Sequence, residues 1–309
     1  MDDMQLFSKH KSDGVVATLW DGDAIEVLKK LRKDSVDLVV TSPPYFIGKE
    51  YDRSLDAKDF IAEIKGVIPK IVRVLKPGGS ICWQVGNHVR DGALIPLDVL
   101  ISAELLKRHD LTLRNRIIWT FNHGAHASNR FSGRHETILW YTKGGVGHFD
   151  LDSVRVPQIY PGKKHYKGPN KGQWSGNPLG KNPGDVWDIG DVWGIPNVKA
   201  NHIEKTEHPC QFPTALVRRL VSALCPRGGL VVDPYAGSCT TAVSSLLEGR
   251  NFHGCDIDTK YLEIGRARLT ALEQGTLQVR EDIPIHIPSG RESVALRPPH
   301  FPMLEVLNG

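Results

Sequence analysis

Two short segments of the sequence place polar and rigid residues directly after an apolar run. The first is SPPY (42–45), which follows the apolar residues 36–40. The second begins at Asp233, after the apolar residues 230–232, and continues through small residues into a sequence with a helical pattern. Proline ends a strand because it has no backbone N–H for the ladder and its φ is fixed. Open α/β sheets bind ligands at the carboxyl ends of their strands, so both segments are candidate sites.

The second segment, DPYAGSCTT (233–241), has the composition of a turn that lies against a small ligand. Its small residues let a ligand approach the backbone, and the predicted helix after it offers free N–H groups and a positive dipole end. The patterns G-x-x-x-x-G-K-[ST] and G-x-G-x-x-G are absent from the sequence, so this turn suits a carboxylate better than a phosphate chain. The residues expected to line it are Ala236, Gly237, Ser238, Thr240 and Thr241.

Acidic residues follow two further predicted strands. Asp256 and Asp258 end the stretch 251–258, and an acid at this position can accept hydrogen bonds from ribose hydroxyls. Asp21 and Asp23 follow another apolar stretch, where a carboxylate could face the amino group of adenine. Read singly, such an Asp is more often a helix cap or turn former. Read together, these acids and the turn predict a ligand with adenine, ribose and a zwitterionic tail.

Strand and helix patterns alternate along most of the chain. Strands are predicted at 14–20, 36–40, 78–86, 113–121, 136–142 and 251–258, with a further strand that runs into a turn at 229–238. Helices are predicted at 24–32, 57–75, 95–109, 212–225, 240–249 and 260–275. This alternation predicts an α/β fold with a mostly parallel sheet covered on both faces. The two strands at 113–121 and 136–142 are expected to be antiparallel neighbours.

The composition is that of a globular protein without a membrane span. The chain has 309 residues, of which 40% are apolar, and a net charge of +4. No apolar run approaches the ~20 residues of a membrane-spanning helix, and the first residues lack a signal core, so we expect a cytoplasmic protein that does not bind membranes. The five cysteines form no C-x-x-C pair, so neither a zinc site nor a disulfide framework is expected, and no metal ligands are predicted.

An irregular stretch between residues 144 and 207 is rich in Gly, Pro, Asn, Lys and Trp. Between residues 155 and 184 it has six basic residues and no acid. Lysines neutralise phosphates, so this stretch predicts a nucleic-acid surface, although a solvated loop is the plainer alternative. A second acid-free loop lies at 122–135. The expected DNA contacts are Arg130, Lys163, Lys164, Lys167 and Lys171.

The pair TSPPY and DPYAGSCTT resembles the two signature motifs of the amino-DNA methyltransferases. Their order, with the SPPY motif first, resembles the circularly permuted β group of that family, and EHPCQFP (207–213) and RHETILWYTK (134–143) are similar to two more of its segments. The resemblance covers residues 14–143 and 207–272. It divides the chain into a catalytic half (1–143), a target-recognition insert (144–207), a cofactor half (208–275) and a Pro-rich tail (276–309).

The resemblance implies a Rossmann-like fold with a seven-stranded, mostly parallel sheet and S-adenosylmethionine as methyl donor. In the family, residues at the positions of Asp233, Pro234, Tyr235 and Phe212 lie beside this cofactor, together with the turn and the ribose acid already named, and Asp23 is expected near its adenine. Cys239 departs from the family pattern, which has Gly there. Its Cβ is expected to narrow the turn, and a helix N-terminus is expected to make its thiol somewhat acidic.

The SPPY motif implies methyl transfer to an exocyclic amine of a base in double-stranded DNA. The Ser42 hydroxyl oxygen and the Pro43 carbonyl can accept both amine hydrogens, Pro44 stiffens the corner, and Tyr45 can stack on a base that has left the duplex. Serine at the first position favours cytosine N4 over adenine N6. A catalytically inactive DNA-binding protein and a peptide-glutamine methyltransferase are the other classes considered. A cognate restriction endonuclease is a possible partner, and the oligomeric state is not predicted.

Overall fold

A nine-stranded sheet forms the centre of the computed structural model, which describes residues 5–44, 57–121, 124, 126–187, 195–199, 202–280 and 298–299. The strands lie in the order β1-β2-β11-β10-β3-β4-β8-β7-β9. Their bounds are β1 Gln5–Ser12, β2 Val15–Asp21, β3 Val36–Thr41, β4 Leu75–Val85, β7 Leu111–Thr120, β8 His135–Lys143, β9 Val186–Trp187, β10 Leu230–Asp233 and β11 Asn251–Asp256. A separate hairpin pairs β5 (His88–Arg90) with β6 (Ala93–Ile95).

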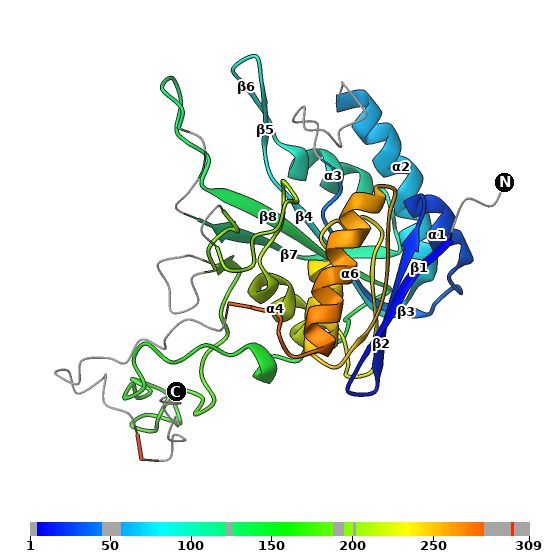
Figure 1. The fold of residues 1–309 in the computed structure, drawn as a ribbon. Helices are drawn as coiled ribbons and strands as arrows, with labels where there is room; N and C mark the ends of the chain where they lie inside the picture. The colour runs from blue at the N-terminus through cyan, green and yellow to red at the C-terminus, as the bar shows by residue number, and fades with distance from the viewer. Residues whose placement is uncertain are drawn as a thin grey trace.

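Helices cover both faces of this sheet (Figure 1). The helices α1 (Ala24–Lys30), α2 (Ala57–Val74) and α3 (Leu97–Leu105) pack into one apolar core. The helices α4 (Thr214–Leu224), α5 (Thr240–Leu247) and α6 (Thr259–Glu273) pack into the other. Alternate residues of β3 divide between the two cores, with Leu38 and Val40 on one side and Val39 on the other, as the period of two requires. A short 3-10 helix, η1 (Asp152–Val154), follows β8.

The seven strands and six helices predicted from the sequence are all present in the structure. The five strands β2, β11, β10, β3 and β4 run parallel, and β8 pairs antiparallel with both β4 and β7, as expected for the last two strands. The sheet is larger than the seven strands predicted, because β1 adds to one edge and β9 to the other. Among the described helices, none is both long enough and apolar enough to cross a lipid bilayer.

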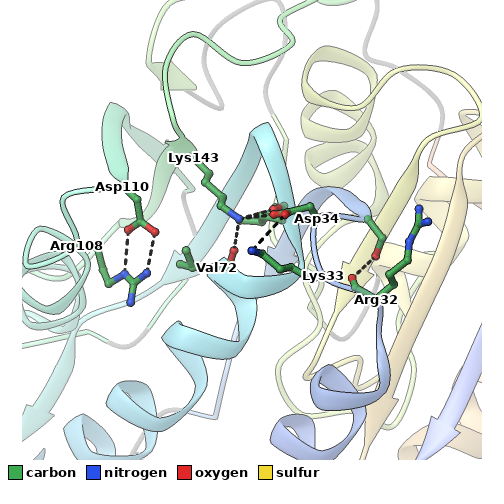
Figure 2. Close-up of polar contacts among 9 residues, drawn as sticks. Arg32, Lys33, Asp34, Val72, Arg108, Asp110 and Lys143 are labelled. Carbon is green, nitrogen blue, oxygen red and sulfur yellow. Dashed lines mark hydrogen bonds and ion pairs between the residues drawn. The ribbon is translucent and has the colours of Figure 1, made fainter.

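At the sheet edge where β3 begins, polar contacts fasten the elements to one another (Figure 2). The Lys143 ammonium donates to the Asp34 carboxylate at 2.7 Å and to the Val72 and Leu75 carbonyls at 2.8 and 2.7 Å. Val72 lies in the last turn of α2 and Leu75 directly follows that helix, so the cation also complements the helix dipole. Nearby, Arg108 donates two hydrogen bonds to Asp110. The Lys143 contacts therefore join the end of β8 to the end of α2 and to Asp34 before β3, at the edge opposite the two candidate segments.

Candidate functional site

The two candidate segments lie side by side at the centre of the sheet. Strand β10 pairs in parallel with β3, with Val232 opposite Val39, so both strands end at the same edge. Immediately beyond this pairing, the Thr41 hydroxyl donates to the Asp233 carboxylate at 3.1 Å. The corner after β3 and the turn after β10, separated by almost 200 residues of sequence, are thus joined directly.

Asp233 is the centre of this junction. Its side chain is 1% exposed, and its other oxygen accepts a hydrogen bond from the Thr241 hydroxyl in the first turn of α5 at 2.7 Å. The backbone N–H of Tyr235 donates to the same carboxylate at 3.1 Å. Burial raises the pKa of Asp233 to about 6, against the opposing effect of these hydrogen bonds. The carboxylate therefore ties β3, β10 and α5 together.

Asp256 connects the turn to the next strand. The Gly237 N–H donates to its Oδ2 at 2.9 Å, and the Asp258 N–H donates to its Oδ1 at 2.9 Å. Burial is the main cause that raises the pKa of Asp256. The backbone of the turn also reaches β11, because the Ala236 N–H donates to the Cys255 carbonyl at 2.8 Å. A carboxylate fixed in this way at the end of β11 has lone pairs left for a hydroxyl ligand.

The turn itself requires backbone geometry that favours glycine. Gly237 has φ 49°, and a Cβ placed there would lie 2.9 Å from Nε2 of His208. The imidazole of His208 therefore covers the turn closely, and its ring also contacts Tyr261 edge-on at 4.4 Å. His208 belongs to the segment EHPCQFP, which resembles a segment of the family, but its place over the turn was not predicted from the sequence.

Cys239 occupies the cap position of α5 in the left-handed conformation, with φ 57° and ψ 33°. A glycine adopts this conformation without strain, which explains why the family pattern has Gly here. The expectation of a somewhat acidic thiol was wrong: the side chain is fully buried, and burial raises the thiol pKa well above its usual range. The side chain packs against α6, where a Cβ on Gly265 would lie 2.2 Å from its sulfur, and its thiol donates to the Gly237 carbonyl of the turn at 3.7 Å. Gly265 thus provides the space that Cys239 needs.

A buried arginine supports the turn from below and was not predicted from the sequence. Arg268, in α6, donates to the Ser238 carbonyl at 2.6 Å and to the Thr240 hydroxyl at 2.9 Å. Its pKa is lowered by burial and raised by the nearby Glu204 carboxylate. That carboxylate is 4% exposed and accepts from the N–H and the hydroxyl of Thr214 at 2.9 and 2.7 Å. The positive charge lies beneath the N-terminus of α5, where it adds to the helix dipole.

Three other predicted cofactor residues occupy different settings. The Asp23 carboxylate caps α1, accepting from the Ile25 N–H at 2.8 Å and the Glu26 N–H at 3.3 Å. Phe212 is partly buried and packs against the core on the side of α4 and α5. The Tyr235 hydroxyl donates to the Glu63 carboxylate of α2 at 3.0 Å. Burial raises the pKa of Glu63, a residue that gave no signal in the sequence.

The corner after β3 is described as far as Pro44. Pro43 is buried, and Ser42 and Pro44 are half-buried directly beyond Thr41. Tyr45, the fourth residue of the motif, lies outside the described residues. Pro234, next to Asp233 in the facing turn, is buried as well.

The predicted DNA contacts lie in two projections of the chain. Lys163, Lys164, Lys167 and Lys171 are exposed in a small hairpin, where Lys164 and Trp174 form a bridge and the Lys164 ammonium lies 4.4 Å from the Trp174 ring centroid. Within the part of the chain that the structure describes, none of these four lysines pairs with a carboxylate. Arg130 is exposed in the loop between β7 and β8. Figure 1 shows the hairpin region at lower left and this loop at upper left.

Comparison with known families gives the arrangement its context. Residues 36–267 match the profile of the N6 and N4 methyltransferases, described as DNA methylase. This match covers both strand ends and the insert between them. The chain belongs to the N6/N4 DNA methylase family.

Proteins similar to this chain include an adenine methyltransferase and, by fold alone, a cytosine-N4 methyltransferase. The type II methyltransferase M.BglII of Bacillus subtilis is 44% identical over 247 residues, which cover 80% of this chain and 67% of the relative. The DNA adenine methyltransferase YhdJ of Escherichia coli is 32% identical, with 82% of each chain covered. The cytosine-N4-specific PvuII DNA methyltransferase has the same fold, with a TM-score of 0.65 over 88% of this chain and 96% of that one, at 17% identity.

A DNA modification methylase from Thermus thermophilus, solved in complex with S-adenosyl-L-methionine, is 28% identical with a TM-score of 0.59, covering 84% of this chain and 98% of that one. The turn of the present chain fits such a group. It offers the N–H groups of the first turn of α5 and a fixed acid at Asp256, which the Gly237 N–H holds in place.

The buried Asp233 carboxylate predicts a pH dependence of stability. Its pKa is raised on folding from 3.8 to about 6, so the folded state binds more protons between these values, and the free energy of unfolding falls as the pH rises from 4 to 6. The fall due to this group is at most about 3 kcal/mol. Asp233→Asn removes the titrating group and should remove this part of the pH dependence. Urea unfolding of both proteins at several pH values measures the difference, and parallel curves would contradict the prediction.

The contact between Cys239 and Gly265 predicts a coupled pair of substitutions. Gly265→Ala should lower the free energy of unfolding by roughly 1–3 kcal/mol or more, because the new Cβ overlaps the buried sulfur. Cys239→Gly removes that sulfur and the strained backbone, so the double variant should recover most of the loss. A double-mutant cycle by thermal or urea unfolding measures the coupling. Additive effects would show that the two residues do not compete for this space.

Proposed function

We propose that this protein transfers a methyl group from S-adenosylmethionine to the exocyclic N4 amine of a cytosine that has left a DNA duplex. The single observation that carries the proposal is the hydrogen bond between Thr41 and Asp233, which joins the SPPY corner to the cofactor turn. S-adenosylmethionine is the methyl donor, in keeping with the family and with the complex of the Thermus thermophilus relative. The cofactor supplies an electrophilic sulfonium methyl group.

Different residues of the turn would bind different portions of this cofactor. The N-terminus of α5, with Arg268 beneath it, favours the carboxylate of the methionine portion. Asp256 accepts hydrogen bonds from ribose hydroxyls. Asp233 keeps the turn next to Ser42, and positioning of the two reactants supplies much of the rate in a direct displacement.

The corner after β3 makes the amine nucleophilic. An exocyclic amine is a poor nucleophile because its lone pair is delocalised into the ring. The Ser42 hydroxyl oxygen and the Pro43 carbonyl would accept hydrogen bonds from its two N–H groups and favour a tetrahedral nitrogen, whose lone pair then points at the methyl group. As the N–C bond forms, the S–C bond breaks to leave a neutral thioether, and the nitrogen releases one proton to solvent. Pro44 restricts the backbone of the corner, and Tyr45 stacks on the extruded base. No covalent bond between enzyme and base is required.

Adenine N6 is the second candidate acceptor. The serine at position 42 favours cytosine, whereas the relative YhdJ, 32% identical, is an adenine methyltransferase by name. Double-stranded DNA is the proposed substrate in either case. A restriction endonuclease acting separately on the same sequence is part of the proposal, since several relatives are type II methyltransferases.

Digestion of methylated DNA to nucleosides separates the two acceptors. The purified protein is incubated with unmethylated plasmid and S-adenosylmethionine, and the nucleosides are analysed by mass spectrometry. N4-methylcytosine is the expected product. N6-methyladenine would select the second candidate, and absence of any methylated base would overturn the proposed activity.

The lysine hairpin predicts the salt dependence of DNA binding. If Lys163 and Lys164 each neutralise a phosphate, Lys163→Ala with Lys164→Ala should lower the slope of log K against log salt by up to about 2. Lys29→Ala with Lys30→Ala is the matched control, because α1 lies on the far side of the molecule from the hairpin (Figure 1). Fluorescence titrations at several salt concentrations measure the slope. An unchanged slope in the hairpin variant would place the DNA surface elsewhere.

A further inference from the structure

The most exposed large apolar side chain among the described residues lies at the tip of the loop between β7 and β8. Phe131 is 99% exposed, so it gains nothing for the fold from burial. A lone apolar residue on a surface is ordinary, but such residues are usually partly covered by their neighbours. The position of this phenylalanine and the charge of the loop around it therefore indicate what the side chain could contact.

The loop holds the phenylalanine in a defined place. The Phe121 N–H donates to the Arg134 carbonyl at 3.0 Å, which extends the β7–β8 pairing by one step. Nearer the tip, the Ala127 N–H donates to the Ser132 hydroxyl oxygen at 3.1 Å. The Arg130 guanidinium donates to the carbonyl of Phe131 itself at 3.1 Å. These hydrogen bonds restrain the backbone of the turn that carries Phe131.

The charge of the loop suits a polyanion. Residues 121–135 include two arginines and three histidines and no acid. Arg130 precedes the phenylalanine, and Arg134 lies at the base of the turn. Proteins that bend DNA insert apolar side chains between base pairs while neighbouring basic side chains contact phosphates. Phe131 and the two arginines have the residue types for this arrangement.

The sheet places this loop at the edge that carries the proposed active site. Thr41 of β3 pairs with Trp83 of β4, Trp83 pairs with Leu139 of β8, and Leu139 pairs with Arg116 of β7. Thr41 and Arg116 therefore lie at the same height along the strand direction. Strand β7 continues to Thr120, four residues or about 13 Å beyond that level. Three strand spacings, about 14 Å, separate β7 from β3, a distance comparable with the ~12 Å width of the major groove. The loop therefore stands where DNA held over Ser42 would reach it.

We propose that Phe131 is a wedge that inserts into the duplex beside the target base and stabilises the gap that base leaves. This inference rests on the proposed function. The cost of removing a base from the stack is then offset in part by stacking of the phenylalanine ring on the neighbouring bases. Arg130 and Arg134 position the wedge by contacts to the flanking phosphates.

The test compares methyl transfer to two duplexes that differ only opposite the target base, after the target sequence has been mapped with the wild-type enzyme. In one the target is paired, and in the other it faces an abasic site, which makes extrusion easy. Phe131→Ala should reduce the single-turnover rate about ten- to hundredfold on the paired duplex. On the abasic duplex the rate should stay within about threefold of wild type.

Val146→Ala is the matched control, because Val146 is 79% exposed in the turn that follows the far end of β8. It should leave both rates unchanged, and Phe131→Trp should retain most of the rate on the paired duplex. Equal rates for Phe131→Ala and wild type on the paired duplex, or the same loss on both duplexes, would overturn the wedge. A wild-type enzyme that methylates no site in DNA, so that no target sequence can be mapped, would instead overturn the proposed function, and the wedge with it.

Discussion

A buried carboxylate that accepts hydrogen bonds from two threonines fixes the relation on which the site depends. Asp233 bonds to Thr41 at the end of β3 and to Thr241 at the start of α5. Burial opposes ionisation of this carboxyl group, and the hydrogen bonds favour it. Because burial has the larger effect, burying the ionised group costs free energy that other interactions of the fold must offset. This junction adds a side-chain contact to the backbone pairing of β3 with β10, and so helps to set the spacing of the two strand ends.

The order of the elements along the chain explains why a junction is needed. The corner at Ser42 and the turn at Gly237 belong to different halves of the sequence, and the sheet brings them together only through the pairing of two β3 residues with two β10 residues. The same edge collects the Asp256 carboxylate and the loop that carries Phe131. The opposite edge carries Lys143 and Asp34, whose contacts close the fold. Polar residues at one edge thus form the candidate site and those at the other edge stabilise the fold, a difference that their residue types alone do not reveal.

Local patterns in the sequence were sufficient to predict most of the fold. Apolar runs and helical spacing gave the seven central strands and the six helices, because each depends on residues close in sequence. Strand β1 was missed although Asp13-Gly14, with φ of 45° and 82°, forms the two-residue hairpin turn that such a dipeptide favours. Strand β9 has only two residues and depends on its partner β7, so no local pattern specifies it.

The candidate site was predictable only where a motif carried it. Asp233, Gly237, Thr241 and Asp256 meet in the structure as the motifs implied. Arg268, Glu204 and Gly265 were not found, because their contacts depend on how α6 packs against α5, which no short pattern encodes. The acidity expected of the Cys239 thiol failed for a related reason: the helix N-terminus was read from the sequence, but the depth of burial was not. The effect of burial on a pKa depends on tertiary packing, which a short sequence pattern does not reveal.

The most direct measurement is a crystal structure of this protein with S-adenosylhomocysteine, the product of methyl transfer. The account predicts that its ribose hydroxyls contact Asp256, that its carboxylate lies at the N-terminus of α5, and that its sulfur faces the space beside Ser42 and Pro43. A ligand bound away from the turn, or one whose sulfur points away from Ser42, would contradict the central claim that these two strand ends form one active site.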